Sequence, residues 1–220
     1  MMKHEKLKNV KAHIQYKLAD GTRVPGTTTV LGILSKPALI HWAWDLGMRQ
    51  IDYKKYRDVL ADIGTLAHLL VLNRHLGGEE VDLSPYSSEQ IDKAENGLLK
   101  YYEWEKKHTV EPVIIEEPMV SELHRYGGTI DCLARVDGVL TLLDIKTGKG
   151  IYAEFGHQLA AYLSLLLEHG HDPKQAMILR LGRSEDEGFE VKEYGMKELE
   201  AHWELFKACL KIYGLRKQTA

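Results

Sequence analysis

Two β-prone runs, 128–136 and 139–146, are separated only by Asp137 and Gly138. An Asp-Gly pair accepts the positive φ angles of a two-residue hairpin turn, so the flanking runs are expected to pair as antiparallel strands. A third β-prone run, 110–121, precedes them. The sequence therefore predicts a three-stranded antiparallel sheet near the middle of the chain, around which the remaining segments must pack.

The segments on both sides of these strands mostly follow a helical period. Before the strands, the sequence predicts a short helix capped by one of Thr27 to Thr29, a helix beginning at Pro37, a helix from Val59 towards Leu76 that Gly77-Gly78 stops, and a long amphipathic helix capped at Ser87-Ser88. After them, it predicts a helix at 154–168, strands at 176–181 and 189–194, and a closing helix. The expected fold class is α/β (α+β), with a central mixed sheet flanked by helices and an N-terminal helical region.

A chain of 220 residues with 44% hydrophobic content can bury a substantial core, and no stretch resembles a linker. We expect a single domain, 1–220, whose part up to about residue 109 is mainly helical. The net charge of -3 and the pI near 6.4 provide no overall basic field. A polyanionic partner would have to be held by a local patch or through metal ions.

The chain has two cysteines, Cys132 and Cys209, without a metal-binding spacing. This excludes a disulfide framework and a four-cysteine iron-sulfur cluster, and it favours a reducing environment. The charged N-terminus lacks an apolar segment after it, and no apolar run reaches the length of a membrane span. We therefore expect a soluble, cytoplasmic protein with no membrane partner.

The chemically informative residues lie on the two strands of the predicted hairpin. Asp131 and Asp144 can converge at one end of the sheet, and strand alternation sends Asp144 and Lys146 to the same face. Carboxylates suit hard cations such as Mg²⁺ or Mn²⁺, which activate water and neutralise charge on a scissile phosphate. The lysine could orient that water or take its proton. The alternative is an ordinary exposed ion pair on a strand face, and spacing alone does not decide between the two.

Several segments together resemble the RecB-like branch of the PD-(D/E)XK nucleases. The resemblance rests on Gly128-Thr129-Ile130-Asp131, Asp144-Ile145-Lys146-Thr147 and Gln158-Leu159-Ala160-Ala161-Tyr162, in that order, preceded by Gly64-Thr65-Leu66-Ala67-His68. The segment from Val24 to Leu31 is similar to one in phage-type and mitochondrial-genome-maintenance exonucleases. Two departures are Ile130 in place of the name-giving proline and the lack of an acidic residue four positions after His68.

The resemblance implies a restriction-endonuclease-like catalytic core at about 110–215, with Asp131, Asp144 and Lys146 as catalytic residues. Asp131, Asp144, the backbone carbonyl of Ile145, and His68 would be metal ligands, and His68 would favour Mn²⁺ over Mg²⁺. Taken alone, His68 could equally be a core histidine on an apolar helix face.

The family also often carries an acidic residue on the strand before the hairpin. Glu117 is our choice, although Glu116 and Glu122 are equally plausible from the sequence. The predicted substrate contacts come from the helix after the hairpin and from the end of its second strand. They are Gln158, Tyr162, Thr147 and Lys149.

By this resemblance, the expected function is metal-dependent hydrolysis of DNA, by an exonuclease acting on DNA ends, possibly single-stranded, in recombination, repair or phage DNA metabolism. A recombination protein is a possible partner. The competing hypothesis is a catalytically silent nucleic-acid-binding module of the same fold, acting in recombination or packaging. A third is an unrelated α/β protein with an accidental motif match. The intact set of Asp131, Asp144 and Lys146 argues against both alternatives.

Overall fold

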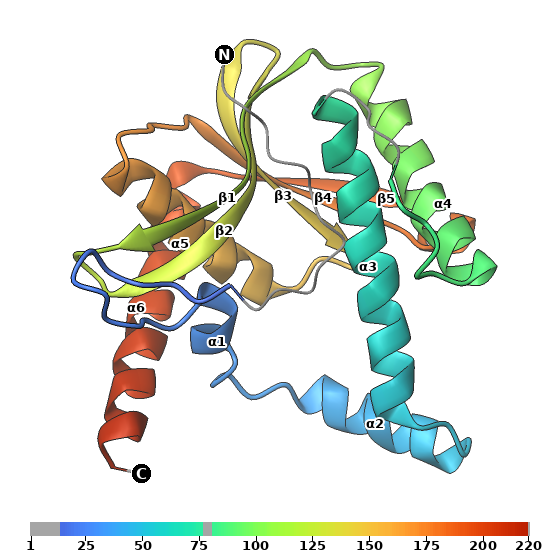
Figure 1. The fold of residues 1–220 in the computed structure, drawn as a ribbon, viewed down its shortest axis with the longest axis horizontal. Helices are drawn as coiled ribbons and strands as arrows, with labels where there is room; N and C mark the ends of the chain where they lie inside the picture. Colours follow the sequence, from blue (N-terminus) through green and yellow to red (C-terminus); the bar gives the residue numbers. More distant parts are fainter. Residues whose placement is uncertain (1–13, 77–80, 220) are drawn as a thin grey trace.

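The computed structural model describes residues 14–76 and 81–219. The predicted stop at Gly77-Gly78 lies outside the described residues. The centre of the fold is a mixed five-stranded sheet in the order β1-β2-β3-β4-β5 (Figure 1). The strands are β1 (Val110–Ser121), β2 (Tyr126–Val136), β3 (Val139–Thr147), β4 (Gln175–Leu181) and β5 (Phe189–Tyr194).

Only the pairing of β3 with β4 is parallel, and the other neighbours are antiparallel. A parallel neighbour requires a crossover connection, which α5 (Ala153–Glu168) provides. The predicted central mixed sheet is confirmed.

The turn between β2 and β3 has the predicted geometry. Asp137 and Gly138 have φ angles of 51° and 84°, as a tight hairpin with two left-handed residues requires. The Asp137 carboxylate accepts a hydrogen bond from the backbone N–H of Thr109 at 2.8 Å and lies 2.7 Å from Nδ1 of His108. The turn is thereby tied to the segment that leads into β1.

The remaining helices are α1 (Thr27–Leu31), α2 (Pro37–Met48), α3 (Tyr53–His75), α4 (Ser88–Glu105) and α6 (Met196–Gln218). Pro37 begins α2, and Ser87 caps α4 in a reciprocal capping box with Gln90, as predicted. The predicted threonine cap of α1 is wrong. Gly26 is the N-cap residue, and the Thr27 hydroxyl donates instead to the Gly127 carbonyl at 2.9 Å.

Helices cover both faces of the sheet (Figure 1). One core joins Leu142 and Ile178 of the sheet to α1, α5 and α6, and the other joins Leu143 and Leu179 to α3 and α4. Because consecutive strand residues point to opposite faces, neighbours such as Leu142 and Leu143 supply different cores. None of the helices in the described ranges is both long and apolar enough to cross a membrane.

Candidate active site

The ladder between β2 and β3 opens at one end, and the predicted carboxylates lie at the opening. The last paired residues are Cys132 and Leu143, so the next positions, Asp131 and Asp144, are the first beyond the ladder. The Asp131 carboxylate accepts a hydrogen bond from the Ile145 N–H at 2.9 Å and so replaces the missing backbone partner. β3 itself continues to pair with β4 as far as Thr147. The opening therefore exposes two acidic residues without disrupting the sheet.

His68 reaches this opening from α3. Its Nδ1 lies 3.7 Å from Oδ2 of Asp131. Gly64 lies one turn earlier on the same face of α3, and a Cβ there would come within 2.8 Å of Oγ1 of Thr147. The absence of a side chain at Gly64 therefore lets α3 approach β3 closely enough for His68 to meet the carboxylates.

The third member of the cluster is Glu116. Ligand atoms of His68, Glu116 and Asp131 all lie within 4.8 Å of one another, whereas Glu117 is exposed. Ile115 pairs with Cys132 and Glu117 with Ile130, which sets Glu116 opposite Asp131. The choice of Glu117 is therefore corrected to its neighbour. An irregularity in the β1–β2 register and the positive φ of Glu116 (50°) determine which glutamate faces the cluster.

Asp144 and Lys146 form a buried ion pair beside the cluster, with Nζ 2.6 Å from Oδ2. Asp144 is 0% exposed, and among the described residues neither of its oxygens has a partner in hydrogen-bonding geometry; the ion-pair contact with Lys146 is its compensation. The ammonium also lies 5.5 Å from the centre of the Phe155 ring on α5. The predicted projection of Asp144 and Lys146 to one side of β3 is thus observed.

Burial changes the protonation equilibria of the whole cluster. Burial, followed by the nearby Lys146 charge, lowers the pKa of His68 to about 4, so its imidazole is neutral at physiological pH. Burial raises the pKa of Asp144 to about 6 and also raises that of Asp131. Burial, together with repulsion from Asp131, raises the pKa of Glu116 to about 7. The three carboxyl groups therefore resist carrying negative charge together unless a cation is present.

Burial alone would lower the pKa of Lys146, but the carboxylates of Asp144 and Asp131 outweigh it and raise that pKa. The lysine is accordingly an ammonium group at neutral pH, held next to the carboxylates.

These residues fit a divalent cation. The donors are two carboxylates and one neutral imidazole, and Asp144 contributes a buried oxygen, Oδ1, without a partner. Carboxylates are the preferred ligands of Mg²⁺ and Mn²⁺, and an imidazole also suits transition metals. A hydrogen bond between His68 and the Ile145 backbone places that backbone at the cluster as well. The set matches a cation site, and the choice between Mg²⁺ and Mn²⁺ stays open.

Two tyrosines flank the strand that carries Asp131. A Cβ on Gly127 would lie 2.3 Å from the Tyr16 ring, and a Cβ on Gly128 would lie 2.6 Å from the Tyr162 ring. The glycine pair is therefore needed because aromatic rings press on both sides of β2. Gln158 donates a hydrogen bond to the Tyr162 hydroxyl at 2.7 Å, as expected for residues four apart on α5. Burial, and then the charges of Asp131 and Asp144, raise the pKa of Tyr162 well above its usual value.

The other two predicted substrate contacts occupy different environments. Thr147 is half-buried against Gly64 at the edge of the cluster, whereas Lys149 is exposed. The Lys149 charge helps lower the pKa of Glu187, on the loop between β4 and β5. Lys149 therefore lies towards that loop, and its contact with substrate stays a prediction.

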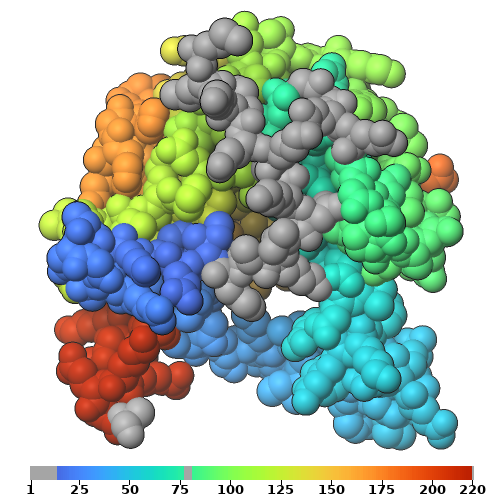
Figure 2. All heavy atoms as spheres, in the orientation of Figure 1, coloured from blue at the N-terminus to red at the C-terminus, as the bar shows by residue number. Residues whose placement is uncertain are grey.

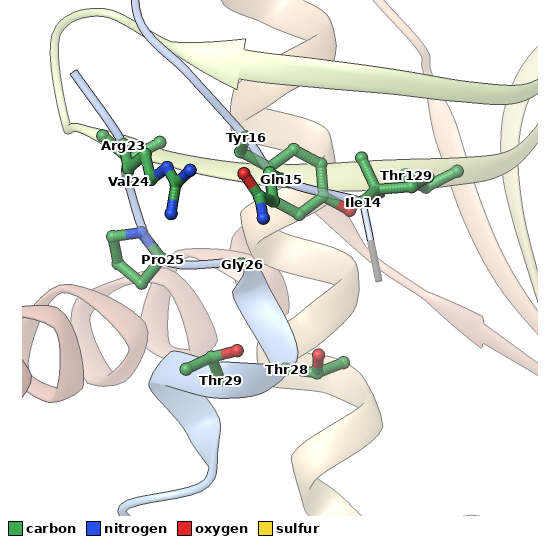
Figure 3. A pocket seen from close by; sticks show the side chains of 10 residues that line it. All are labelled: Ile14, Gln15, Tyr16, Arg23, Val24, Pro25, Gly26, Thr28, Thr29 and Thr129. Carbon is green, nitrogen blue, oxygen red and sulfur yellow. Dashed lines mark hydrogen bonds between the residues drawn. The ribbon is translucent and has the colours of Figure 1, made fainter. Parts of the chain in front are cut away.

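A pocket of about 490 Å³ lies on the Tyr16 side of β2 (Figure 3). Tyr16 links it to the active-site strand, because its hydroxyl is hydrogen-bonded to Oγ1 of Thr129 at 2.9 Å, two residues before Asp131. Figure 3 shows the Arg23 guanidinium and the Gln15 amide pointing into the space beside Gly26. The lining residues include one cation, several hydroxyl groups and no carboxylate. They are Ile14, Gln15, Tyr16, Arg23, Val24, Pro25, Gly26, Thr28, Thr29 and Thr129.

Neither Tyr16 nor this pocket was anticipated from the sequence, which showed only the threonine-rich segment beside it. The pairing of Gly26 with Gly127 joins residues about 100 positions apart. A tyrosine next to a turn carries no signal of such a distant contact.

Comparisons with known proteins agree with the fold. A protein from Eubacterium rectale that carries an exonuclease assignment has a TM-score of 0.51 and 12% identity over 66% of this chain, and the chain spans 64% of that protein's length. The alkaline exonuclease LHK-Exo from Laribacter hongkongensis has a TM-score of 0.35 and 16% identity, over 70% of this chain and 83% of that one. No curated protein sequence matches the chain.

The sequence itself matches the model of the PD-(D/E)XK nuclease superfamily over residues 41–213. The match spans most of the chain and includes His68, Asp131, Asp144 and Lys146. The restriction-endonuclease-like α/β architecture expected from the sequence is thus confirmed, and the chain belongs to the PD-(D/E)XK nuclease superfamily.

Proposed function

We propose that this protein is a divalent-metal-dependent exodeoxyribonuclease, which hydrolyses phosphodiester bonds at DNA ends. The observation that carries the proposal is the grouping of His68, Glu116 and Asp131 within 4.8 Å, beside the buried pair of Asp144 and Lys146. Such a concentration of buried acidic groups is costly without a cation, and an ammonium group beside it suits a phosphate.

In this proposal His68, Glu116, Asp131, Asp144 and the backbone carbonyl of Ile145 hold the cation. When bound, the cation would activate water and offset charge on the scissile phosphate. The chain's own contribution is to keep the acceptors in place: Asp131 is held by the Ile145 N–H, and His68 stays neutral and able to donate a lone pair.

Lys146 supplies the positive charge nearest the reacting phosphate. Its ammonium group is held by Asp144 and by the Phe155 ring. It can donate hydrogen bonds to a phosphate oxygen or to the attacking water, and the raised pKa keeps it protonated in the free enzyme. Thr147, Gln158 and Tyr162 border the same region and would position the strand without reading its sequence.

The pocket beside Thr129 supports action at strand ends. It offers one guanidinium, hydroxyl groups and an amide, without an opposing carboxylate, and it lies two residues along β2 from Asp131. This lining suits the phosphate of a terminal nucleotide, which would set the strand end at a defined distance from the cation. DNA as the substrate, a role in recombination, repair or phage DNA metabolism, and a recombination partner rest on the sequence resemblance.

Digestion of end-labelled linear and circular DNA, with Mg²⁺, Mn²⁺ or EDTA, tests the proposal. We expect metal-dependent loss of linear DNA only, abolished in Lys146→Ala. Cutting of circular DNA would replace the exonuclease by an endonuclease. Absence of cleavage under every condition, with retained DNA binding, would favour the silent binding module.

Arg23→Ala tests the pocket separately. We expect this variant to raise the KM for linear DNA with phosphorylated ends and to affect ends bearing hydroxyl groups less. Lys17→Ala is the matched control, because Lys17 lies across the same turn but does not line the pocket. An equal effect of the two variants would remove the pocket from the proposal.

A further inference from the structure

Large apolar side chains are concentrated on the arm, which we define as residues 36–59 and which comprises α2 and the first two turns of α3. Within the described residues, seventeen large hydrophobic side chains are exposed, and seven of them belong to the arm. They are Leu39, Ile40, Trp44, Met48, Tyr53, Tyr56 and Val59. A concentration of this kind marks a binding surface more often than a scattered distribution does.

The exposed side chains of α2 form a stripe. Ile40, Trp44 and Met48 are spaced four residues apart and are 70%, 65% and 67% exposed. Leu46 is the buried residue of α2, and Trp42 contacts Tyr56 of α3 with ring centroids 6.1 Å apart. The helix is therefore anchored by one side, while an apolar stripe faces solvent.

The arm also carries a surplus of positive charge. Residues 36–59 contain five lysines or arginines and three aspartates, in a chain whose net charge is -3. Arg49 and Arg57 pair with aspartates of the arm. Lys54 and Lys55 lie between Tyr53 and Tyr56, and neither forms an ion pair with another described residue.

The arm is continuous with the active site. α3 runs from Tyr53 through His68, so Tyr56 lies about 18 Å along the helix from the metal-binding histidine at 1.5 Å per residue. α1 packs with α5 and α6, whereas the later part of α3 packs on the opposite face of the sheet, and α2 connects them. Figure 2 shows α2 and the start of α3 standing off from α6 at the lower edge of the molecule, with the outline notched between them.

We propose that the arm binds single-stranded DNA, with bases stacking on Trp44, Tyr53 and Tyr56 and with Lys54 and Lys55 contacting phosphates. Flat apolar side chains interleaved with cations are the features that bind single strands without sequence preference. In a duplex the base faces are already stacked on one another, so they are not available to the arm. This inference rests on the proposed function and makes a single strand, or a single-stranded end, the preferred substrate.

A second copy of the chain fits the arm less well. The cores of protein interfaces are depleted of lysine, whereas Lys54 and Lys55 lie in the middle of this surface. The strand phosphates would be complementary to these two cations.

The test measures binding of the full chain to fluorescein-labelled oligodeoxythymidylate of about 20 nucleotides, which exceeds the site size of most single-strand-binding surfaces. Anisotropy is recorded in EDTA, so binding is observed without cleavage. We expect Trp44→Ala and Tyr56→Ala each to weaken single-strand binding by about tenfold to a hundredfold. Trp44→Phe should retain most of the affinity, and a duplex of equal length should bind more weakly and respond little to any of these changes.

Ile212→Ala and Lys211→Ala are the matched controls, since both residues are exposed on α6, away from the arm. Thermal melting of each variant checks that it is folded. Equal affinity for single and double strands, or unchanged affinity in Trp44→Ala, overturns the inference. Self-association that Trp44→Ala abolishes, with DNA affinity unchanged, also overturns it and assigns the arm to a second copy.

Cleavage is measured separately with Mn²⁺ on the same variants. Binding that depends on Trp44 without any cleavage would refute the proposed nuclease function and keep the single-strand surface. Cleavage that is indifferent to the arm variants, together with unchanged binding, would refute the surface and keep the nuclease.

Discussion

The active-site cluster and the arm depart from the usual distribution of polar and apolar groups in opposite directions. In the cluster, the Asp144 carboxylate is fully buried, and the ion pair with Lys146 is its compensation. On the arm, Ile40 and Trp44 are 70% and 65% exposed. Folding ordinarily pairs buried charges and covers large apolar side chains. Each region therefore lacks something that an occupant would supply, a cation in the cluster and bases on the arm.

The two regions should respond to different perturbations. The cluster is governed by charge, so it should respond to divalent cations, to pH and to neutral replacements of its carboxylates. The arm is governed by apolar area and a few cations, so it should respond to loss of ring surface. One helix, α3, serves both, with Tyr53 at its start and His68 beyond its middle.

The largest expected effect is the loss of cleavage in Lys146→Ala. Removing the ammonium group held 2.6 Å from Asp144 takes away the charge nearest the phosphate, and we expect cleavage to fall by about 10²- to 10⁴-fold. Single-turnover digestion measures it. Lys149→Ala, at an exposed lysine on the same loop, should change the rate far less. Similar losses in both variants would mean that general positive charge, rather than the buried lysine, drives cleavage.

The next effect distinguishes Glu116 from Glu117. Saturating Mn²⁺ at about 100 times its Kd should raise the melting temperature of the wild type by roughly 5–10 °C. Glu116→Gln should melt higher than the wild type in EDTA, because a repelled buried carboxylate is removed, and should gain little from Mn²⁺. Glu117→Gln should behave like the wild type. A reversal of these two results would restore Glu117 as the cluster residue.

A matched pair of glycines compares the packing of the two regions. Gly64→Ala places a Cβ 2.8 Å from Oγ1 of Thr147, so we expect a loss of about 1–3 kcal/mol and weaker Mn²⁺ binding through displacement of His68. A Cβ on Gly47 of α2 meets nothing within 4 Å, and Gly47→Ala should be neutral or stabilise by up to about 1 kcal/mol. Chemical denaturation measures both. A neutral Gly64→Ala would show that α3 does not need its close approach to β3.

The smallest expected effect is a pH dependence of cation binding. The pKa of Glu116 is raised to about 7, so this group keeps its proton at pH 6 and has lost it by pH 8, whereas His68, with a pKa near 4, stays neutral throughout. We expect Mn²⁺ affinity to rise about tenfold over this range, equivalent to about 3–5 °C in melting temperature. Glu116→Gln should flatten the dependence.

The metal-free protein provides the sign control. A carboxyl group whose pKa is raised on folding contributes stability at low pH that is lost as the pH rises through its folded value. Without Mn²⁺, the wild type should therefore lose the Glu116 contribution between about pH 4.5 and pH 7. A cation effect that is constant from pH 6 to 8 would argue against Glu116 as a ligand.

The central hairpin and its acidic residues could be predicted because their determinants are local. The Asp137-Gly138 turn establishes which strands are neighbours, and alternation along β3 then places Asp144 with Lys146. Glu116 could not be distinguished from Glu117, because the choice depends on the register of β1 and on a positive φ angle. Neither quantity is visible in a run of residues that are all compatible with a strand.

Long-range packing limited the rest of the prediction. A helical stripe in α2 indicates a buried face, but Leu39 on that stripe is 52% exposed and Leu46 is buried. Periodicity shows which side chains share a face and does not show whether another part of the chain covers it. The contact of Tyr16 with Gly127 and the pocket beside it depend on segments about 100 residues apart.

The glycine pair between Tyr16 and Tyr162 bears on how far this protein can be shortened. The superfamily match begins at residue 41, yet the ring that fills the space above Gly127 and the hydroxyl that binds its carbonyl belong to Tyr16 and Thr27. A fragment trimmed to 41–213 would expose one side of the strand that carries Asp131 and would lose the adjoining pocket. For this chain, the boundaries of sequence similarity are therefore narrower than the unit that supports its catalytic strand.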